Sequence, residues 1–171
     1  MIDSCIANPL LDWGAGEVVI PDLDGGLLPF GIFDCTFKEM KERYGYNRHR
    51  AEQTRKLMDY VTLLRKYGAS GWIMVNGSYV TSKDSPGDID IIVVMNKAAM
   101  RYQTAEDRCA MLYLYQPDIA KTFGLEAFAG YGDTPSETGF VNEVQWVTDY
   151  TEAFTTVLET GERKGILRIE L

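Results

Sequence analysis

Two periodicities of hydrophobic and polar positions divide this chain into strands and helices. Apolar runs rich in β-branched residues predict strands over residues 17–20, 71–76, 88–95, 124–129, 140–147 and 166–171. Apolar residues at helical spacing, together with start and stop signals, predict helices over residues 36–45, 47–67, 104–115, 117–123 and 149–159. This mixed order predicts an α/β (α+β) fold with a small mixed β-sheet flanked by helices.

The two helices before the first long strand carry clear end signals. Thr36 and Glu39 form a capping box, in which a hydroxyl caps the helix and a carboxylate three residues later bonds back to the cap. Asn47 can cap the longer helix, and Gly68 can end it. The predicted core stripe of this longer helix consists of Leu57, Met58, Tyr60, Val61 and Leu64.

Residues 1–35 differ from the rest of the chain because proline and glycine recur in them. We interpret them as an extended N-terminal arm that wraps the domain. The sequence has no internal repeat, low-complexity tract or linker. We therefore expect residues 1–171 to form a single domain.

Composition narrows the class of protein. The 171-residue chain is 46% hydrophobic, which is enough for one core. It has no apolar run of about 18 residues and no signal-peptide pattern. Cys5, Cys35 and Cys109 match neither a disulfide framework nor a metal knuckle, so we expect a cytoplasmic protein with reduced thiols and no membrane partner. The net charge of −8 disfavours duplex DNA or long RNA as a ligand, although a local basic patch can still hold a triphosphate or a tRNA end.

Two carboxylates on one strand are the main candidates for chemistry. Side chains alternate along a strand, so Asp88 and Asp90 share a face while Ile89 and Ile91 occupy the other. Their Cα atoms are expected roughly 6.5–7 Å apart, and the two charges repel each other. A divalent cation resolves this conflict, because Mg²⁺ prefers oxygen ligands and accepts one or two carboxylates together with phosphates.

Gly77 and Ser78 end the preceding strand and can bind phosphate. Glycine allows the backbone to approach a bulky anion, and the serine hydroxyl and nearby amides can donate to its oxygens. Because Asp88 follows Ser78 by ten positions, one loop can join two adjacent strands and place this cradle beside the carboxylates. Thr81 and Lys83 in that loop can also contact a nucleotide, but a solvated role is an equal alternative.

The pattern Gly77-Ser78 followed by Asp88-Ile89-Asp90 resembles the nucleotidyltransferase superfamily typified by DNA polymerase beta. A wider set of segments is similar to small, uncharacterised bacterial and phage nucleotidyltransferase-like proteins. These segments are 76–90, 28–32, 47–50 and 164–166. The resemblance implies transfer of a nucleoside monophosphate from a nucleoside triphosphate to an acceptor hydroxyl, with two Mg²⁺ ions. The acceptor is left open between a small molecule, a protein and a tRNA end.

The same resemblance implies a third carboxylate from a neighbouring strand. Glu143 is the best match, and Asp149 is the fallback. Asp88, Asp90 and Glu143 would then hold metal, with Glu143 helping to deprotonate the acceptor. Gly77 and Ser78 would cradle the β and γ phosphates. A long second helical domain is not evident, so we expect an acceptor site that is either shallow or shared with a second subunit of a homodimer or with a partner protein.

Two other interpretations remain beside the enzyme. One is a catalytically inactive nucleotidyltransferase fold that acts as a binding or regulatory, antitoxin-like protein. The other is an interaction domain without a nucleotide site.

A basic segment opens the longer predicted helix. Arg48, His49, Arg50, Arg55 and Lys56 place positive charge where it opposes the helix dipole. An anionic ligand would compensate for this, but we favour a solvated face. His49 is the only histidine of the chain, which excludes a Ser-His-Asp triad and a multi-histidine metal site.

Overall fold

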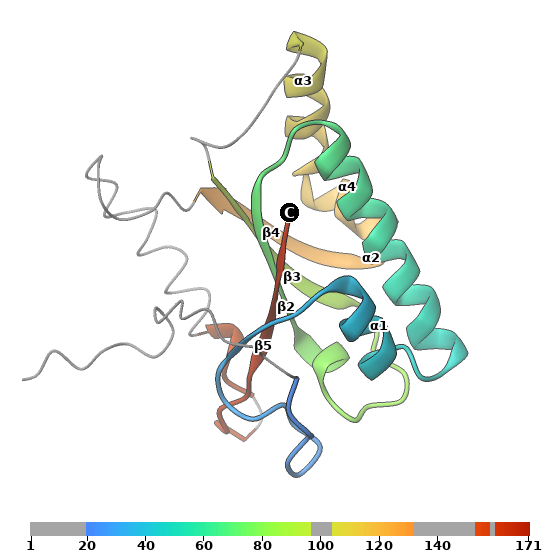
Figure 1. Ribbon diagram of the computed structural model, residues 1–171, viewed down its shortest axis with the longest axis vertical. Helices are drawn as coiled ribbons and strands as arrows, with labels where there is room; N and C mark the ends of the chain where they lie inside the picture. Colours follow the sequence, from blue (N-terminus) through green and yellow to red (C-terminus); the bar gives the residue numbers. More distant parts are fainter. Residues whose placement is uncertain (1–19, 97–103, 132–152, 158–159) are drawn as a thin grey trace, which may run out of the picture.

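The computed structural model describes residues 20–96, 104–131, 153–157 and 160–171 (Figure 1). The strands are β1 (Ile32–Asp34), β2 (Gly71–Asn76), β3 (Ile89–Met95), β4 (Leu125–Tyr131) and β5 (Ile166–Glu170). The helices are α1 (Phe37–Tyr44), α2 (Arg48–Lys66), α3 (Ala105–Leu114) and α4 (Pro117–Thr122), with a single 3-10 turn, η1 (Gly77–Val80), after β2.

One mixed sheet organises these elements. Its five strands run in the order β1-β5-β2-β3-β4. The strand β2 is antiparallel to both β3 and β5, whereas β1 is parallel to β5 and β4 is parallel to β3. The prediction of an α+β fold with a small mixed sheet is therefore confirmed.

The helices α1, α2, α3 and α4 lie on one side of this sheet (Figure 1). Alternate strand residues such as Ile73, Ile91 and Leu167 pack there into one buried cluster with the apolar stripe of α2. The stripe was predicted correctly at Leu57, Tyr60, Val61 and Leu64, which are all buried. Met58 was assigned to it wrongly, because a position next to Leu57 is turned about 100° around the helix and 37% of Met58 is exposed.

The opposite face of the sheet holds a second, smaller apolar cluster. Met74, Ile92, Val94 and Ile166 form it, and Phe154 packs against it from the segment before β5. This face also carries the polar residues considered below. The two clusters confirm the predicted alternation along β3, since Ile91 belongs to one cluster and Ile92 to the other.

Both capping predictions are confirmed. Thr36 and Glu39 form the capping box of α1, and the Asn47 side chain accepts a hydrogen bond from the Arg50 amide at the start of α2. The strand β1 was missed because three residues are too few to show a period, so part of the predicted arm belongs to the sheet edge. The helix predicted over 149–159 is confirmed at Ala153 and Phe154 and wrong after them, because Thr155 lies in a turn and Thr156 bridges to Arg163.

The strand predicted over 140–147 lies outside the described residues, as does the one over 17–20 except for Ile20, which is not in a strand. In the described part of the chain, no helix is both long enough and apolar enough to span a bilayer.

Candidate functional site

Three oxygen-bearing side chains stand in register at one end of the neighbouring strands β2, β3 and β4. Asn76 of β2 pairs with Asp90 of β3, and Asp90 pairs with Glu126 of β4. Directly paired residues of neighbouring strands project from the same face, so these three side chains form a row. Asp88 immediately precedes β3 on the same side. We call Asp88, Asp90 and Glu126 the carboxylate cluster.

Glu126 was missed as a site residue although its strand was predicted. The available signal was a lone carboxylate in an apolar strand, which is weak by itself. Only the parallel register of β3 and β4 places Glu126 opposite Asp90. Glu143 and Asp149, the carboxylates suggested by resemblance, lie outside the described residues.

Burial and charged neighbours both act on the carboxyl of Asp90. Burial, followed by the charges of Asp88 and Glu126, raises the pKa of Asp90 to about 6. A hydrogen bond with the Glu126 carboxyl adds to this rise, whereas the positive charge of Lys164 lowers the pKa. A carboxyl whose ionisation is opposed by two neighbouring carboxylates is typical of a functional site.

Gly77 brings the turn after β2 directly against Asp90. Its φ is +74°, and a Cβ at this position would lie 1.5 Å from Asp90 Oδ2. Because Gly77 has no side chain, the Asp90 carboxylate can lie against the turn. The next residue, Ser78, is half-buried. The predicted proximity of the Gly77-Ser78 turn and Asp90 is confirmed.

The buried guanidinium of Arg50 holds the loop that joins Ser78 to Asp88. Arg50 has 0% exposure, and its Nε donates to the Tyr44 carbonyl oxygen at 2.6 Å. Its two terminal nitrogens donate to the carbonyl oxygens of Tyr79 and Lys83. The guanidinium carbon also lies 4.9 Å and 4.8 Å from the ring centres of Tyr46 and Tyr79.

Other residues of the first turns of α2 bind the same loop. His49 Nε2 lies 2.7 Å from the Pro86 carbonyl oxygen, and the Gln53 side-chain amide donates to that oxygen at 2.9 Å. The Asn47 side chain donates to the Asp84 carbonyl oxygen at 2.8 Å. The solvated-face interpretation is therefore wrong for Arg50, because loop carbonyls compensate its charge.

That interpretation is correct for Arg55. This side chain is exposed and pairs with Glu52 and Asp59 of its own helix. Within the basic segment, Arg50 therefore binds the loop, whereas Arg55 belongs to a solvated helix face.

Thr81 and Lys83 have different surroundings. The Thr81 hydroxyl donates to the Ser78 carbonyl oxygen at 2.8 Å and accepts from the Lys83 amide at 3.2 Å. This hydroxyl therefore shapes the loop. Lys83 is exposed, and its carbonyl oxygen accepts from Arg50, so its ammonium group projects from a fixed backbone.

The donor chemistry of this region fits a divalent cation. All three members of the cluster are carboxylates, and the side-chain oxygen of Asn76 is buried without a hydrogen-bond partner among the described residues. Oxygen donors of this kind suit Mg²⁺. Within the described ranges, however, no three His, Cys, Asp or Glu side chains converge as a ready-made metal cluster. Mutual repulsion of like charges opposes such convergence until a cation lies between them.

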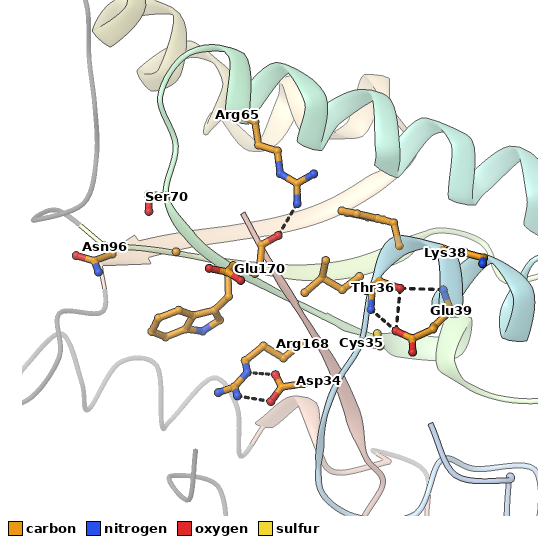
Figure 2. Close-up of a pocket in the computed structure, with 14 residues that line it drawn as sticks. Asp34, Cys35, Thr36, Lys38, Glu39, Arg65, Ser70, Asn96, Arg168 and Glu170 are labelled. Atoms are coloured by element: carbon orange, nitrogen blue, oxygen red, sulfur yellow. Dashed lines mark hydrogen bonds and ion pairs between the residues drawn. The ribbon is translucent and has the colours of Figure 1, made fainter. Parts of the chain in front are cut away.

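A separate hollow of about 1040 Å³ lies at the opposite end of the sheet, where β2 begins and β5 ends (Figure 2). Figure 2 shows Arg168 paired with Asp34, and Arg65 donating to the Glu170 carbonyl oxygen at 2.6 Å. Thr36 and Glu39 close their capping box beside them. These contacts join elements of the fold to one another, so we place the functional site at the carboxylate cluster instead.

Substitution Asp90→Asn should stabilise the metal-free protein at neutral pH. The folded state holds the Asp90 proton more tightly than the unfolded chain, because folding raises this pKa from 3.8 to about 6. Stability contributed by the protonated carboxyl is fully present below about pH 4 and is lost as the pH rises through about 6. Asparagine avoids this loss, so we expect a gain of about 1–2 kcal/mol at pH 7.5 after allowance for solvent screening.

Urea unfolding in EDTA at pH 7.5 and pH 4 measures this effect. The gain should disappear at pH 4, and Asp118→Asn, an exposed position on α4, should change stability little at either pH. An equal gain at both pH values would contradict the assignment.

Comparison with known proteins identifies a family for this chain but assigns no activity to it. The sequence profile of a "Family of unknown function (DUF6932)" matches residues 21–170. No curated protein and no solved structure matches the chain.

Proposed function

The chain belongs to this family of unknown function, and we propose that it is a Mg²⁺-dependent nucleotidyltransferase. It would transfer a nucleoside monophosphate from a nucleoside triphosphate to an acceptor hydroxyl. The observation that carries this proposal is the contact of the Gly77-Ser78 turn with Asp90 in the middle of the carboxylate cluster. Phosphate-binding and cation-binding groups are thereby adjacent, as a metal-bound triphosphate requires.

Each residue of the site has a role in this proposal. Asp88 and Asp90 would hold the divalent ions, with Glu126 rather than Glu143 as the third carboxylate. Glu126 has the position that the resemblance demands, because it projects from a neighbouring strand directly opposite Asp90. Gly77 and Ser78 would contact the β and γ phosphates, and Lys83 extends from the same loop.

The reaction needs one proton acceptor and a held triphosphate. The acceptor oxygen would attack the α phosphorus, the bond from this phosphorus to the bridging oxygen would break, and pyrophosphate would leave. Bound Mg²⁺ would stabilise the charge on the phosphates. At pH 7.5 a carboxyl with a pKa of about 6 is mostly ionised, so Asp90 can accept the proton of the acceptor hydroxyl.

Incubation with α-labelled nucleoside triphosphates, Mg²⁺ and cell extract tests the proposal. We expect a labelled acceptor with the wild-type protein and a loss of at least about a hundredfold in rate with Asp90→Asn or Glu126→Gln, since each removes a charged metal ligand. Glu106→Gln, an exposed position on α3, is the matched control and should retain the rate. Undiminished transfer by Glu126→Gln would assign the third carboxylate elsewhere.

The same experiment separates the enzyme from a binding module. A regulatory protein of the same fold would bind nucleotide without turnover. Such a protein would show micromolar binding of ATP with Mg²⁺ by calorimetry and no labelled acceptor. A small molecule, a protein hydroxyl and a tRNA end remain the acceptor classes, and fractionation of the labelled extract identifies which one is used.

A further inference from the structure

Lys164 is a buried cation that the proposed reaction does not yet use. Only 8% of it is exposed, and its Nζ donates to the Gly77 carbonyl oxygen at 3.1 Å. Gly77 lies 87 positions earlier in the chain. Burial of an ammonium group is costly unless negative charge or hydrogen-bond acceptors compensate it.

The main chain around Lys164 is fixed on both sides. The Lys164 amide donates to the Thr155 carbonyl oxygen at 2.8 Å, and the Gly165 amide donates to that of Leu28 at 2.8 Å. A Cβ on Gly165 would lie 2.2 Å from the Pro29 carbonyl oxygen, so the chain is pressed closely against this segment. The backbone that carries the Lys164 side chain is therefore held in place, and its ammonium group reaches the Gly77 turn from this fixed position.

The Lys164 ammonium group interacts with both the Gly77-Ser78 turn and the carboxylate cluster. It holds the carbonyl of Gly77, and this carbonyl shares a planar peptide unit with the Ser78 amide, so it also fixes the direction of that amide. Its positive charge also lowers the pKa of Asp90, whereas the charges of Asp88 and Glu126 raise it. One side chain thus connects the phosphate-binding turn with the carboxylate cluster.

We infer that Lys164 is the internal counter-ion of the carboxylate cluster and the positioning residue of the Gly77-Ser78 turn. This inference rests on the proposed function for the identity of the ligands, since it makes Lys164 a competitor of the divalent ion. Its positive charge offsets part of the repulsion within the cluster when no cation is bound, and opposes a divalent ion when one binds.

Titration of the metal-free protein with Mn²⁺, followed by electron paramagnetic resonance of the free ion, tests the electrostatic part. Lys164→Met should bind Mn²⁺ roughly three- to tenfold more tightly than wild type, because a repelling charge is removed. A merely structural lysine would have the opposite effect, since its loss would disorder the site and weaken binding. Unchanged or weaker Mn²⁺ binding by Lys164→Met would overturn the inference.

Arg163→Met is the matched control for this titration. It removes the same charge one position away, where the guanidinium lies over the Phe30 ring at 4.3 Å. We expect its Mn²⁺ affinity to stay within about twofold of wild type. An equal increase in both variants would overturn the inference, because it would reflect net charge rather than the place of Lys164.

A double-mutant cycle in EDTA at pH 7.5 tests Lys164 without metal. Lys164→Met should lower the melting temperature. Asp90→Asn should then raise the melting temperature of the Lys164→Met protein by more than it raises that of the wild type. Additive shifts would overturn the inference. If Lys164→Met alone does not fold, folding of the Lys164→Met/Asp90→Asn protein supports the counter-ion role and its failure refutes it.

The two experiments distinguish the two proposals. A wild-type protein that binds no Mn²⁺ would count against the proposed function, and the cycle in EDTA would still decide the role of Lys164.

Discussion

Substitution of Arg50 by methionine should lower the free energy of unfolding by about 4 kcal/mol. The guanidinium donates to the carbonyl oxygens of Tyr44, Tyr79 and Lys83, and methionine would leave these groups without a donor. Each buried polar group that loses its partner costs about 1–3 kcal/mol. Lysine should not rescue the variant, because one ammonium group cannot reproduce the planar fork that reaches three carbonyls.

Arg55→Met is the control for this change. It removes the same charge from an exposed position of the same helix, and its ion pairs with Glu52 and Asp59 should contribute less than about 1 kcal/mol. Chemical unfolding measures both values. Equal effects of the two substitutions would show that Arg50 acts only through helix charge.

Limited proteolysis measures the local consequence of losing Arg50. The loop after Ser78 contains Lys83, whose carbonyl Arg50 holds. Trypsin should cleave after Lys83 faster in Arg50→Met than in Arg55→Met at a denaturant concentration where both are folded. Unchanged cleavage there would show that the loop is held by its other contacts.

Substitution of Gly77 by alanine should destabilise the protein by about 3 kcal/mol. A residue with a side chain pays about 1–2 kcal/mol for the left-handed conformation at a φ of +74°. The new Cβ would also overlap Asp90 Oδ2, and displacing a packed group typically costs a further 1–3 kcal/mol. Because the displaced group is Asp90, nucleotide transfer and Mn²⁺ binding should be lost as well.

Gly87→Ala provides the control in the same loop. Nothing lies within 4 Å of a Cβ at Gly87, so this substitution should leave stability within about 0.5 kcal/mol. Thermal and urea unfolding of the two variants measure the difference. A Gly77→Ala protein as stable as Gly87→Ala would mean that the turn moves freely away from Asp90.

Local features were predictable because each depends on neighbours in the sequence. The capping box of Thr36 and Glu39 and the cap at Asn47 need only residues three positions apart, and both are present. The alternation along β3 needs only the geometry of a single strand. For this reason the opposite directions of Ile91 and Asp90 could be predicted.

Part of the site was predictable for the same reason. Gly77 directly follows β2 and Asp90 lies near the start of β3, and one loop joins these adjacent strands, so their proximity follows from chain connectivity. The strand β1 and the end of the helix predicted over 149–159 were not predictable in this way. A three-residue strand shows no period, and the turn at Thr155 leads into the pairing of Thr156 with Arg163, which lies further along the chain.

By itself, therefore, the sequence determined the mixed order of helices and strands, the caps, the faces of β3 and the adjacency of Gly77 to Asp90. Only the tertiary structure decided that Glu126 stands opposite Asp90, that Arg50 is buried under the loop, and that Lys164 reaches Gly77. The physical reason is that strand register and the compensation of buried charge depend on groups far apart in the chain. No local pattern records which distant carbonyl or carboxylate a charged side chain will meet.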